Sequence, residues 1–400
     1  MKKVVLYISY NGLLDPVGQS QVLPYLRGLC SEYKFELLTF EREVASKEFL
    51  KIQTLRDELS SLGINWHILR TRSRTGLFKK FVDFCSGLAL ASKISNRTKI
   101  DILHARSYVA AMIGCILLKF KRIEKTIFDM RGFMADEYAD IGYWSRRSLK
   151  YYLVKFFEKQ FIKTYDFIVV LTTDAENILH TWGRSQNIKV IPCCVDTKVF
   201  QPLSNEERKK IEEELGFSNK EIYIYSGSLA GWYLLEDMLK YFMMIKKRNN
   251  NAFLLIVTQD ETKELVSLLK KYSIVDYEIT SAQITEMSRF IGIAQLGLLF
   301  IKQSESKKGS FPISMAEYLS CGVPVVTVPF NQYVKKMIAD SNVGLICGTR
   351  DSEEDEYREY LKLIHTPDLR NRCRDVAIEK MSLSKVGIPA YRNLYENLAC

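Results

Sequence analysis

Residues 296–328 read LGLLFIKQSESKKGSFPISMAEYLSCGVPVVTV and contain, in order, a strand, a loop, a helix and a second strand. The apolar run 296–300 has the length and composition of a buried strand. Pro312 suits the first turn of a helix, where an amide N–H has no partner in any case, and Gly322 with Pro324 ends that helix. The stretch therefore predicts one β-α-β unit of a parallel sheet.

The same alternation of short apolar runs and longer helical patterns extends over the whole chain. In the first half we expect strands at 4–9, 35–41, 64–69, 101–104, 126–129, 167–171 and 189–191. In the second half we expect them at 222–226, 253–257, 276–279, 296–300, 325–328 and 343–347. Repeated β-α-β order produces parallel sheets covered by helices, so we predict an α/β protein with two Rossmann-like domains.

The length of 400 residues fits two domains of ordinary size. Pro202, Ser204 and Asn205 interrupt the pattern between the two series of strands. We therefore expect a first domain at 1–196, a hinge at 197–205, a second domain at 206–380, and a C-terminal helix at 381–400 that can return to the first domain. Ligands of such sheets bind beyond the carboxyl ends of the strands, so the loops there are the place to look for a site.

Charge and cysteine content narrow the class of protein. The net charge of +10 comes from the first half, where 31 lysines and arginines face 20 acids, and this asymmetry predicts an anionic partner. The nine cysteines include no CxxC pair and the four histidines are widely spaced, so we expect reduced thiols and no structural metal. The apolar run at the amino terminus is too short for a signal peptide, and we expect a cytoplasmic protein.

The loop and helix after strand 296–300 carry candidate binding residues. Lys307 and Lys308 lie just upstream of backbone amides around Ser310 and Phe311, at a helix start, and such a group suits a diphosphate. The Glu317 carboxylate can accept hydrogen bonds from two vicinal hydroxyls, as a ribose presents. The alternative for Glu317 is a surface residue of an ordinary capped helix.

This segment resembles the signature of glycosyltransferase family 4. Members have the GT-B fold, two Rossmann-like domains facing across a cleft, and transfer sugars from nucleotide donors with retention. The family pattern has two glutamates separated by seven residues, and Glu317 matches the second, which in relatives holds the nucleotide ribose. Gly309 stands at the first position, which in relatives contacts the sugar. In a subgroup with a basic pair, Lys307 and Lys308 match that pair, while Ser314 replaces a later lysine.

Residues 225–233 resemble the opening of the family's second domain. The resemblance implies that Gly227 and Ser228 bring backbone amides to the diphosphate. Most relatives have an arginine and a lysine where this chain has Ser228 and Tyr233. We therefore expect Lys307 and Lys308 to neutralise the leaving diphosphate. Trp232 or Tyr233 either stacks on the ligand or packs against a helix.

Residues 12–22 resemble the family's loop between the first strand and first helix, which approaches the reacting centre. On that resemblance Asp15, Gly18 and Gln19 line the acceptor side. The loop does not match G-x-G-x-x-G, which argues against a dinucleotide dehydrogenase.

Three polar residues at strand ends of the first half are catalytic candidates. Asp129 and Arg131 follow the strand 126–129 and resemble a motif of related enzymes; they form either an acceptor clamp or a structural ion pair. His104 ends another strand and is either a general base or a packing histidine.

The sequence contains no Asp-x-Asp, the pair that holds a divalent metal on donor phosphates in the other major glycosyltransferase fold. We therefore expect no cofactor and no metal, with lysines and helix termini stabilising the diphosphate.

Two basic runs suggest a membrane contact. The first holds Arg70, Arg72, Arg74, Lys79 and Lys80. The second interleaves Arg146, Arg147, Lys150, Lys155, Lys159 and Lys163 with Tyr151, Tyr152, Phe156, Phe157 and Phe161. Such patterns fit peripheral binding to an anionic surface at the inner face of the cell membrane. The alternative is a helix with buried aromatics and a solvated basic face.

The resemblance implies a retaining, hexosyltransferase-type enzyme that moves a sugar from a nucleotide-sugar to a glycan or lipid-linked acceptor, in cell-surface polysaccharide synthesis. A sugar-nucleotide epimerase or phosphorylase of the same fold, and a relative that binds donor without turnover, remain open. Nucleic acid is not an expected partner, because the basic runs fall on predicted helices and loops rather than on a strand face.

Overall fold

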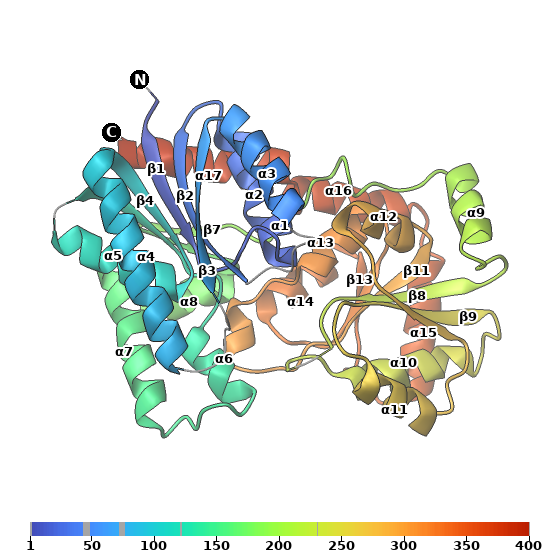
Figure 1. Ribbon diagram of the computed structural model, residues 1–400. Helices are drawn as coiled ribbons and strands as arrows, with labels where there is room; N and C mark the ends of the chain where they lie inside the picture. Colours follow the sequence, from blue (N-terminus) through green and yellow to red (C-terminus); the bar gives the residue numbers. More distant parts are fainter. Residues whose placement is uncertain (1, 43–48, 72–76, 121, 230, 400) are drawn as a thin grey trace. The chain divides into compact units, whose positions relative to one another are not determined.

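The computed structural model describes residues 2–42, 49–71, 77–120, 122–229 and 231–399. The chain forms two compact units, each built on its own sheet (Figure 1). The first unit comprises Met1–Pro192 together with Val386–Cys400, and the second comprises Cys193–Lys385. Residues 197–205, expected as a hinge, are part of the second unit, and the last helix of the chain packs in the first.

The first unit contains a parallel sheet of seven strands in the order β3-β2-β1-β4-β5-β6-β7. The strands are β1 Val4–Ser9, β2 Lys34–Arg42, β3 Ile64–Thr71, β4 Ile100–Arg106, β5 Ile123–Asp129, β6 Phe167–Val170 and β7 Ile188–Val190. The strand order reverses between β1 and β4. The loops that follow these two strands lead to opposite faces of the sheet, and a crevice for a ligand is expected between them.

Helices connect these strands and cover the sheet (Figure 1). They are α1 Pro16–Gln21, α2 Leu23–Leu29, α3 Phe49–Ser61, α4 Leu77–Arg97, α5 Tyr108–Lys119, α6 Met134–Asp140, α7 Leu149–Thr164, α8 Thr173–Thr181 and, from the end of the chain, α17 Ile388–Ala399. The hydroxyls of Ser148 and Thr172 cap α7 and α8 by accepting backbone N–H groups, which explains where these two helices begin.

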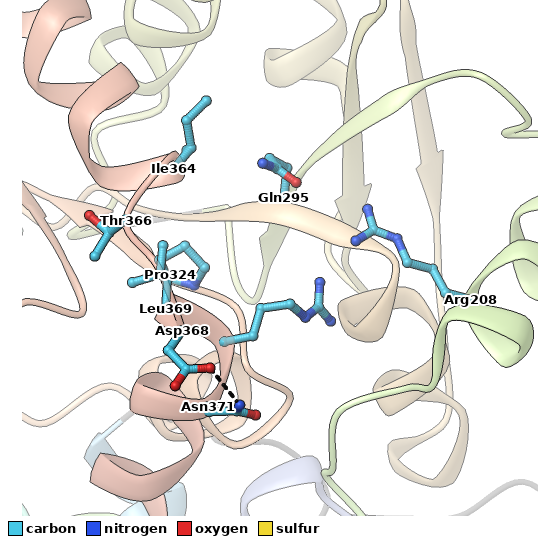
Figure 2. Close-up of a pocket in the computed structure, with 9 residues that line it drawn as sticks. Arg208, Gln295, Pro324, Ile364, Thr366, Asp368, Leu369 and Asn371 are labelled. Atoms are coloured by element: carbon cyan, nitrogen blue, oxygen red, sulfur yellow. Dashed lines mark hydrogen bonds between the residues drawn. The ribbon is translucent and has the colours of Figure 1, made fainter.

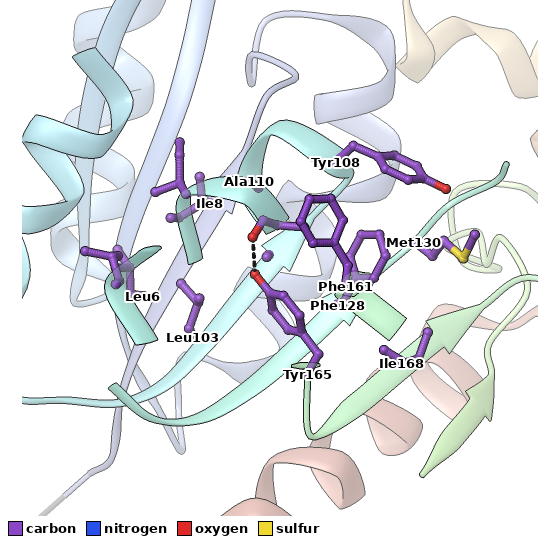
Figure 3. Packing of buried hydrophobic residues seen from close by; sticks show 14 of the residues in the cluster. Leu6, Ile8, Leu103, Tyr108, Ala110, Phe128, Met130, Phe161, Tyr165 and Ile168 are labelled. Carbon is purple, nitrogen blue, oxygen red and sulfur yellow. Dashed lines mark hydrogen bonds between the residues drawn. The ribbon is translucent and has the colours of Figure 1, made fainter. Parts of the chain in front are cut away.

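The core under α5 and α7 is apolar with aromatic rings at its centre (Figure 3). The Phe128 ring of β5 lies 5.9 Å from the Phe161 ring of α7. Tyr165 is also buried, and its hydroxyl donates to the Ala111 carbonyl at 2.7 Å, so its polar atom is satisfied. This packing fixes α7 against the sheet.

The second unit contains a parallel sheet of six strands in the order β10-β9-β8-β11-β12-β13. The strands are β8 Glu221–Ser226, β9 Ala252–Val257, β10 Tyr277–Thr280, β11 Ala294–Leu299, β12 Val325–Thr327 and β13 Gly344–Ile346. Here the order reverses between β8 and β11. Both sheets are parallel and flanked by helices, which confirms the predicted α/β class with two Rossmann-like units.

The helices of the second unit are α9 Asn205–Glu214, α10 Leu235–Lys246, α11 Lys263–Lys271, α12 Ile284–Gly292, the short 3-10 helix η2 Ser306–Gly309, α13 Ile313–Ser320, α14 Gln332–Ser341, α15 Glu353–Ile364 and α16 Leu369–Met381; a π-helical turn, η3 Leu383–Gly387, follows α16. Ser204 and Glu207 form a capping box that begins α9.

Gly297 sets how closely α13 packs on the sheet. A Cβ atom at this position would lie 2.3 Å from the Tyr318 ring, so only glycine leaves room for it. The buried Tyr318 hydroxyl accepts the Ser226 amide at 2.7 Å and lies 2.9 Å from the Ser226 hydroxyl. These contacts tie α13 to the end of β8 and fix the position of its neighbour, Glu317.

Within the described part of the chain, no helix combines the length and the apolar character needed to span a membrane.

Candidate functional site

The candidate site of the second unit is built by the segments that follow β8, β11 and β12. These three strands are neighbours in the sheet, and the reversal of strand order falls between the first two. The segment after β8 pairs with the segment after β11, because Tyr233 and Ile301 form an antiparallel bridge. Loops from two sides of the reversal therefore meet at the edge where ligands of such sheets bind.

Lys307 lies inside this group of loops. Its residue is 7% exposed, and its ammonium nitrogen lies 3.7 Å from the centre of the Trp232 ring. The Lys302 amide donates to the Trp232 carbonyl at 2.7 Å, which joins the backbone of Trp232 to the segment after β11. A partly desolvated cation on an aromatic face is a strong local positive charge, suited to an anionic ligand.

The neighbouring candidates lie differently. The Lys308 ammonium turns to the Glu305 carboxylate at 2.8 Å, and the Lys308 side chain is 45% exposed. The Ser310 amide donates to the Lys307 carbonyl at 3.1 Å. Phe311 is buried, with its ring 5.9 Å from the Tyr333 ring. Of the two lysines, Lys307 is therefore the better placed to face a bound anion.

Asn331, at the start of α14, holds the loop that carries Lys307. Its side-chain amide donates to the carbonyls of Lys307 at 3.0 Å and Ser310 at 2.8 Å. Its side-chain oxygen accepts the Val334 amide at 2.8 Å and caps α14. One buried amide thus joins the loop after β11 to the helix after β12.

Glu317 is the fifth residue of α13 and is 9% exposed. Burial raises the pKa of its carboxyl group to about 7. A buried carboxyl without a compensating cation is unfavourable for folding, and such groups concentrate at functional sites. Its location inside the fold disfavours the alternative of a surface glutamate.

The loop after β8 is tied down by a carboxylate that the sequence reading did not single out. Asp260 accepts the Leu229 amide at 2.8 Å and the Ser228 hydroxyl. The Gly227 amide donates to the Val257 carbonyl at 3.1 Å, and Gly227 has a φ of 142°. A phosphate oxygen at this loop would compete with Asp260 for the same donors.

A hollow of about 330 Å³ lies elsewhere in the second unit (Figure 2). Gln295, the second residue of β11, and Pro324, just before β12, line it, so it opens at the amino ends of these strands. None of the candidate residues contributes to it. It lies at the opposite end of the sheet from the loops around Lys307.

In the first unit, the loop after β1 is held by a buried carboxylate from β2. Glu41 accepts the amides of Leu13 at 2.7 Å and Leu14 at 3.4 Å, and the Thr39 hydroxyl at 2.8 Å. A Cβ atom on Gly12 would lie 2.2 Å from a Glu41 oxygen, which explains a glycine there. Burial raises the pKa of Glu41, and its hydrogen bonds oppose that rise.

The predicted acceptor-side residues belong to the same loop. The Gln19 side chain donates to the Leu13 carbonyl at 2.6 Å, and Gly18 is buried. The Asp15 carboxylate lies 3.6 Å from the Arg42 guanidinium. These residues shape the loop through contacts with its own backbone and with β2.

Asp129, at the end of β5, lies in a buried charged cluster. Its carboxylate is 3.8 Å from the Arg106 guanidinium and 3.6 Å from the Arg131 guanidinium, and it accepts the Tyr391 hydroxyl at 3.1 Å. Burial alone would raise the pKa of Asp129, but Arg131, His104 and Arg106 hold it well below its usual range. Asp129 is therefore ionised at neutral pH.

Arg131 extends this cluster towards α1. It has a φ of 62°, in the left-handed region, and its guanidinium donates to the Gln21 side chain at 3.3 Å. Its side chain is 13% exposed, more than the 2% of Asp129. Of the predicted pair, Arg131 is the member that solvent and ligands can reach.

His104 lies at the closed end of the cluster. It is 1% exposed, its Nδ1 is 2.7 Å from the Tyr395 hydroxyl, and its ring is 4.3 Å from the Tyr7 ring. Burial lowers its pKa, so the ring is neutral at physiological pH. This enclosure favours the packing alternative over a general base.

Two family models match the chain. Residues 207–380 match the model described as glycosyl transferases group 1, and residues 42–199 match glycosyltransferase family 4. The chain is a family 4-like glycosyltransferase.

Solved structures share the fold of this glycosyltransferase along its whole length. Sucrose-phosphate synthase from Thermosynechococcus elongatus is 13% identical, covers 99% of this chain and 100% of its own, and superposes with a TM-score of 0.75. Anabaena HepE in complex with UDP and glucose is 13% identical over 99% of each chain, with a TM-score of 0.71. A glycosyltransferase from Rickettsia africae is 16% identical over 100% of this chain and 99% of its own, with a TM-score of 0.69. These likenesses establish the GT-B fold class.

Among curated proteins, no sequence matches this glycosyltransferase. Within the described residues, no three histidine, cysteine, aspartate or glutamate side chains gather as a metal site would require.

Proposed function

We propose that this glycosyltransferase transfers a sugar from a nucleotide-sugar with retention, and that its second unit binds the donor. Two buried residues of the segment after β11 carry the proposal: Lys307, whose ammonium lies on the Trp232 ring, and Glu317 of α13, the helix that Tyr318 ties to the end of β8. Lys307 offers charge to a diphosphate, and Glu317 offers two oxygens to ribose hydroxyls. The relatives in complex with UDP or UDP-glucose support a nucleotide donor.

In the proposed reaction the bond between the anomeric carbon and the diphosphate breaks, and a bond from that carbon to an acceptor oxygen forms. The acceptor proton goes to the departing phosphate oxygen, and the nucleoside diphosphate leaves. Lys307 would stabilise the negative charge that develops on this leaving group. Either front-face attack or a covalent intermediate gives retention.

A panel of nucleotide-sugars tests the donor site. Thermal unfolding would be measured with UDP-, GDP-, ADP- and CMP-sugars, and the true donor stabilises by about 2.7 kcal/mol at 100 times its dissociation constant. Release of nucleoside diphosphate only when an acceptor is added would support transfer. Interconversion of two sugar nucleotides without acceptor would instead indicate an epimerase. Absence of stabilisation by every donor would contradict the proposal.

For the acceptor, we propose a glycan or lipid-linked glycan in cell-surface polysaccharide synthesis, bound by the first unit at the loop after β1 and near Arg131. The positive charge of the first half supports an anionic partner.

We also propose a peripheral contact with the inner face of the cell membrane. Of the basic run at 70–80, Arg70 is exposed, while Arg72, Arg74 and the side chains of Lys79 and Lys80 lie outside the described residues.

A further inference from the structure

One side of α7 is a continuous row of exposed apolar side chains. The members follow the pattern i, i+3, i+4, i+7, i+8, a spacing that places them on one face of a helix. Their exposed fractions are 83% for Leu149, 59% for Tyr152, 52% for Leu153, 54% for Phe156 and 39% for Phe157. We call these five residues the α7 stripe. Contiguous apolar surface of this kind marks interaction sites on soluble proteins.

The opposite face of α7 already supplies the packing that the unit needs. Phe161 and Ile162 are buried in the core beside β5, and Glu158 is fully buried. Tyr151 also turns inward, where its hydroxyl donates to the Asp136 carboxylate at 2.8 Å. The stripe is therefore a second, outward apolar face on a helix whose inner face already packs in the core.

Positive charge borders the stripe on both sides. At 3.6 residues per turn, Lys150 lies along one margin and Lys159 along the other, and Lys163 follows the stripe at the carboxyl end of the helix. All three are exposed. Glu158 is the only acid between residues 141 and 165, and its burial removes it from this surface. An apolar band between lysine margins is the pattern of a helix that lies in a membrane interface.

We propose that the α7 stripe inserts into the surface of an anionic lipid bilayer, with its lysine margins among the headgroups. A second copy of this chain fits the face poorly, because a two-fold contact would bring lysine margins of both copies together. An anionic bilayer complements both features at once, since it takes up apolar side chains and attracts cations. The inference rests on the membrane contact proposed above and deepens it by naming the element that makes the contact.

Vesicle flotation tests the inference on the full chain. The unaltered protein should float with vesicles of phosphatidylcholine and phosphatidylglycerol and remain behind with phosphatidylcholine alone. Replacing Leu153 and Phe156 by glutamate should lower the bound fraction by about tenfold or more, because charged groups resist insertion. Replacing Lys150, Lys159 and Lys163 by glutamine should remove the preference for anionic vesicles.

Val275→Glu is the matched control, because Val275 is an 82% exposed apolar residue in the second unit. This variant should float like the unaltered protein, and melting curves of all variants should agree, since the changed residues are exposed. Equal binding to neutral vesicles, or no binding to either, overturns the inference. A dimer in solution that dissociates in the Leu153→Glu, Phe156→Glu variant would assign the stripe to self-association and overturn it too.

Flotation needs neither donor nor acceptor, so its result stands apart from the proposed function. Titration of nucleoside diphosphate into the stripe variant should give the affinity of the unaltered protein. If no nucleotide binds either protein, the donor proposal fails while the flotation result still decides the membrane proposal.

Discussion

Glu317 is the residue on which the donor proposal rests. Hydrogen bonds to a charged group contribute about 1.5–3 kcal/mol, so Glu317→Ala should weaken binding of the nucleoside diphosphate by about tenfold to a hundredfold. Glu317→Gln keeps one acceptor oxygen and should fall between. Calorimetric titration measures both. Glu305→Ala is the control, since its carboxylate pairs with Lys308 near the protein surface. Unchanged affinity in Glu317→Ala would move the donor site elsewhere.

The buried carboxyl of Glu317 also predicts a pH dependence of stability. Burial raises its pKa from 4.5 to about 7, so between these values the folded chain keeps a proton that the unfolded chain has lost. The free energy of unfolding should therefore fall by about 3 kcal/mol as pH rises through this window. Above the window it should change no further.

Denaturant unfolding of the protein and of Glu317→Gln, at about pH 5 and about pH 8, isolates this contribution as the difference between the two. Glutamine does not titrate, so the variant should lose less stability at the higher pH. Parallel pH profiles for the two proteins would show that burial does not raise the pKa of Glu317.

At the scale of elements, periodicity predicted the order of strands well. The predicted strand 4–9 coincides with β1, and the other predicted strands overlap β2 to β13 with ends that differ by at most three residues. The helix expected after Pro312 is α13, which begins at Ile313. Local patterns suffice for these elements because apolar spacing and turn residues act between neighbours in sequence.

The contacts that position the site were beyond the reach of local patterns. Tyr318 and Ser226 are 92 residues apart, and Tyr391 and Asp129 are 262 apart. The residues next to them in the sequence do not indicate which distant residue is the hydrogen-bond partner. Asp260 carried the weak signal of an acid shortly after a strand. The different environments of Lys307 and Lys308 could not be predicted for the same reason. Two adjacent lysines are equivalent in a local pattern, and only the packing of the surrounding loops distinguishes them.

The helix α17 contributes two tyrosine hydroxyls to the first unit, and their hydrogen bonds should differ in strength. Tyr391 donates to the Asp129 carboxylate, whereas Tyr395 bonds His104, a ring kept neutral by burial. Tyr391→Phe should therefore lower the free energy of unfolding by about 1.5–3 kcal/mol, and Tyr395→Phe by about 0.5–1.5 kcal/mol.

Denaturant unfolding of the first unit measures both variants. If Asp129 and Arg131 serve the acceptor, Tyr391→Phe should also reduce turnover while the affinity for nucleoside diphosphate stays unchanged. Equal losses of stability in the two variants would contradict the assignment of charge to Asp129 and of neutrality to His104.

For the whole molecule we expect transfer without a metal ion and with retained configuration. In the proposed site, Lys307 on the face of Trp232 would supply the positive charge that a divalent ion supplies in other enzymes. Turnover should be unchanged by EDTA, and the new linkage, assigned by NMR, should have the anomeric configuration of the donor. Loss of activity with EDTA and its recovery with manganese would refute the first expectation, and an inverted linkage the second.

The chain leaves the first unit at Pro192 and returns to it at Val386, so that unit depends on residues from both ends of the sequence. In α17, Tyr391, Leu394, Tyr395 and Leu398 are each less than 5% exposed. Burial of one such side chain contributes about 1.5–3 kcal/mol, and the four together, about 6–12 kcal/mol, rival the whole stability of a domain. A chain ending at Lys385 should therefore lack cooperative unfolding of the first unit.

The second unit contains no residue after Lys385, so in the shortened chain it should melt as before and respond to nucleoside diphosphate as it does in the full chain. Calorimetric melting separates the two transitions. The full chain with exposed Asn393 and Asn397 changed to alanine is the control, since these positions alter α17 without removing its buried face. If the shortened chain kept both transitions, α17 would be an accessory of the first unit rather than part of its core. If it lost both, the second unit would depend on the first for its fold, and donor binding could not belong to the second unit alone.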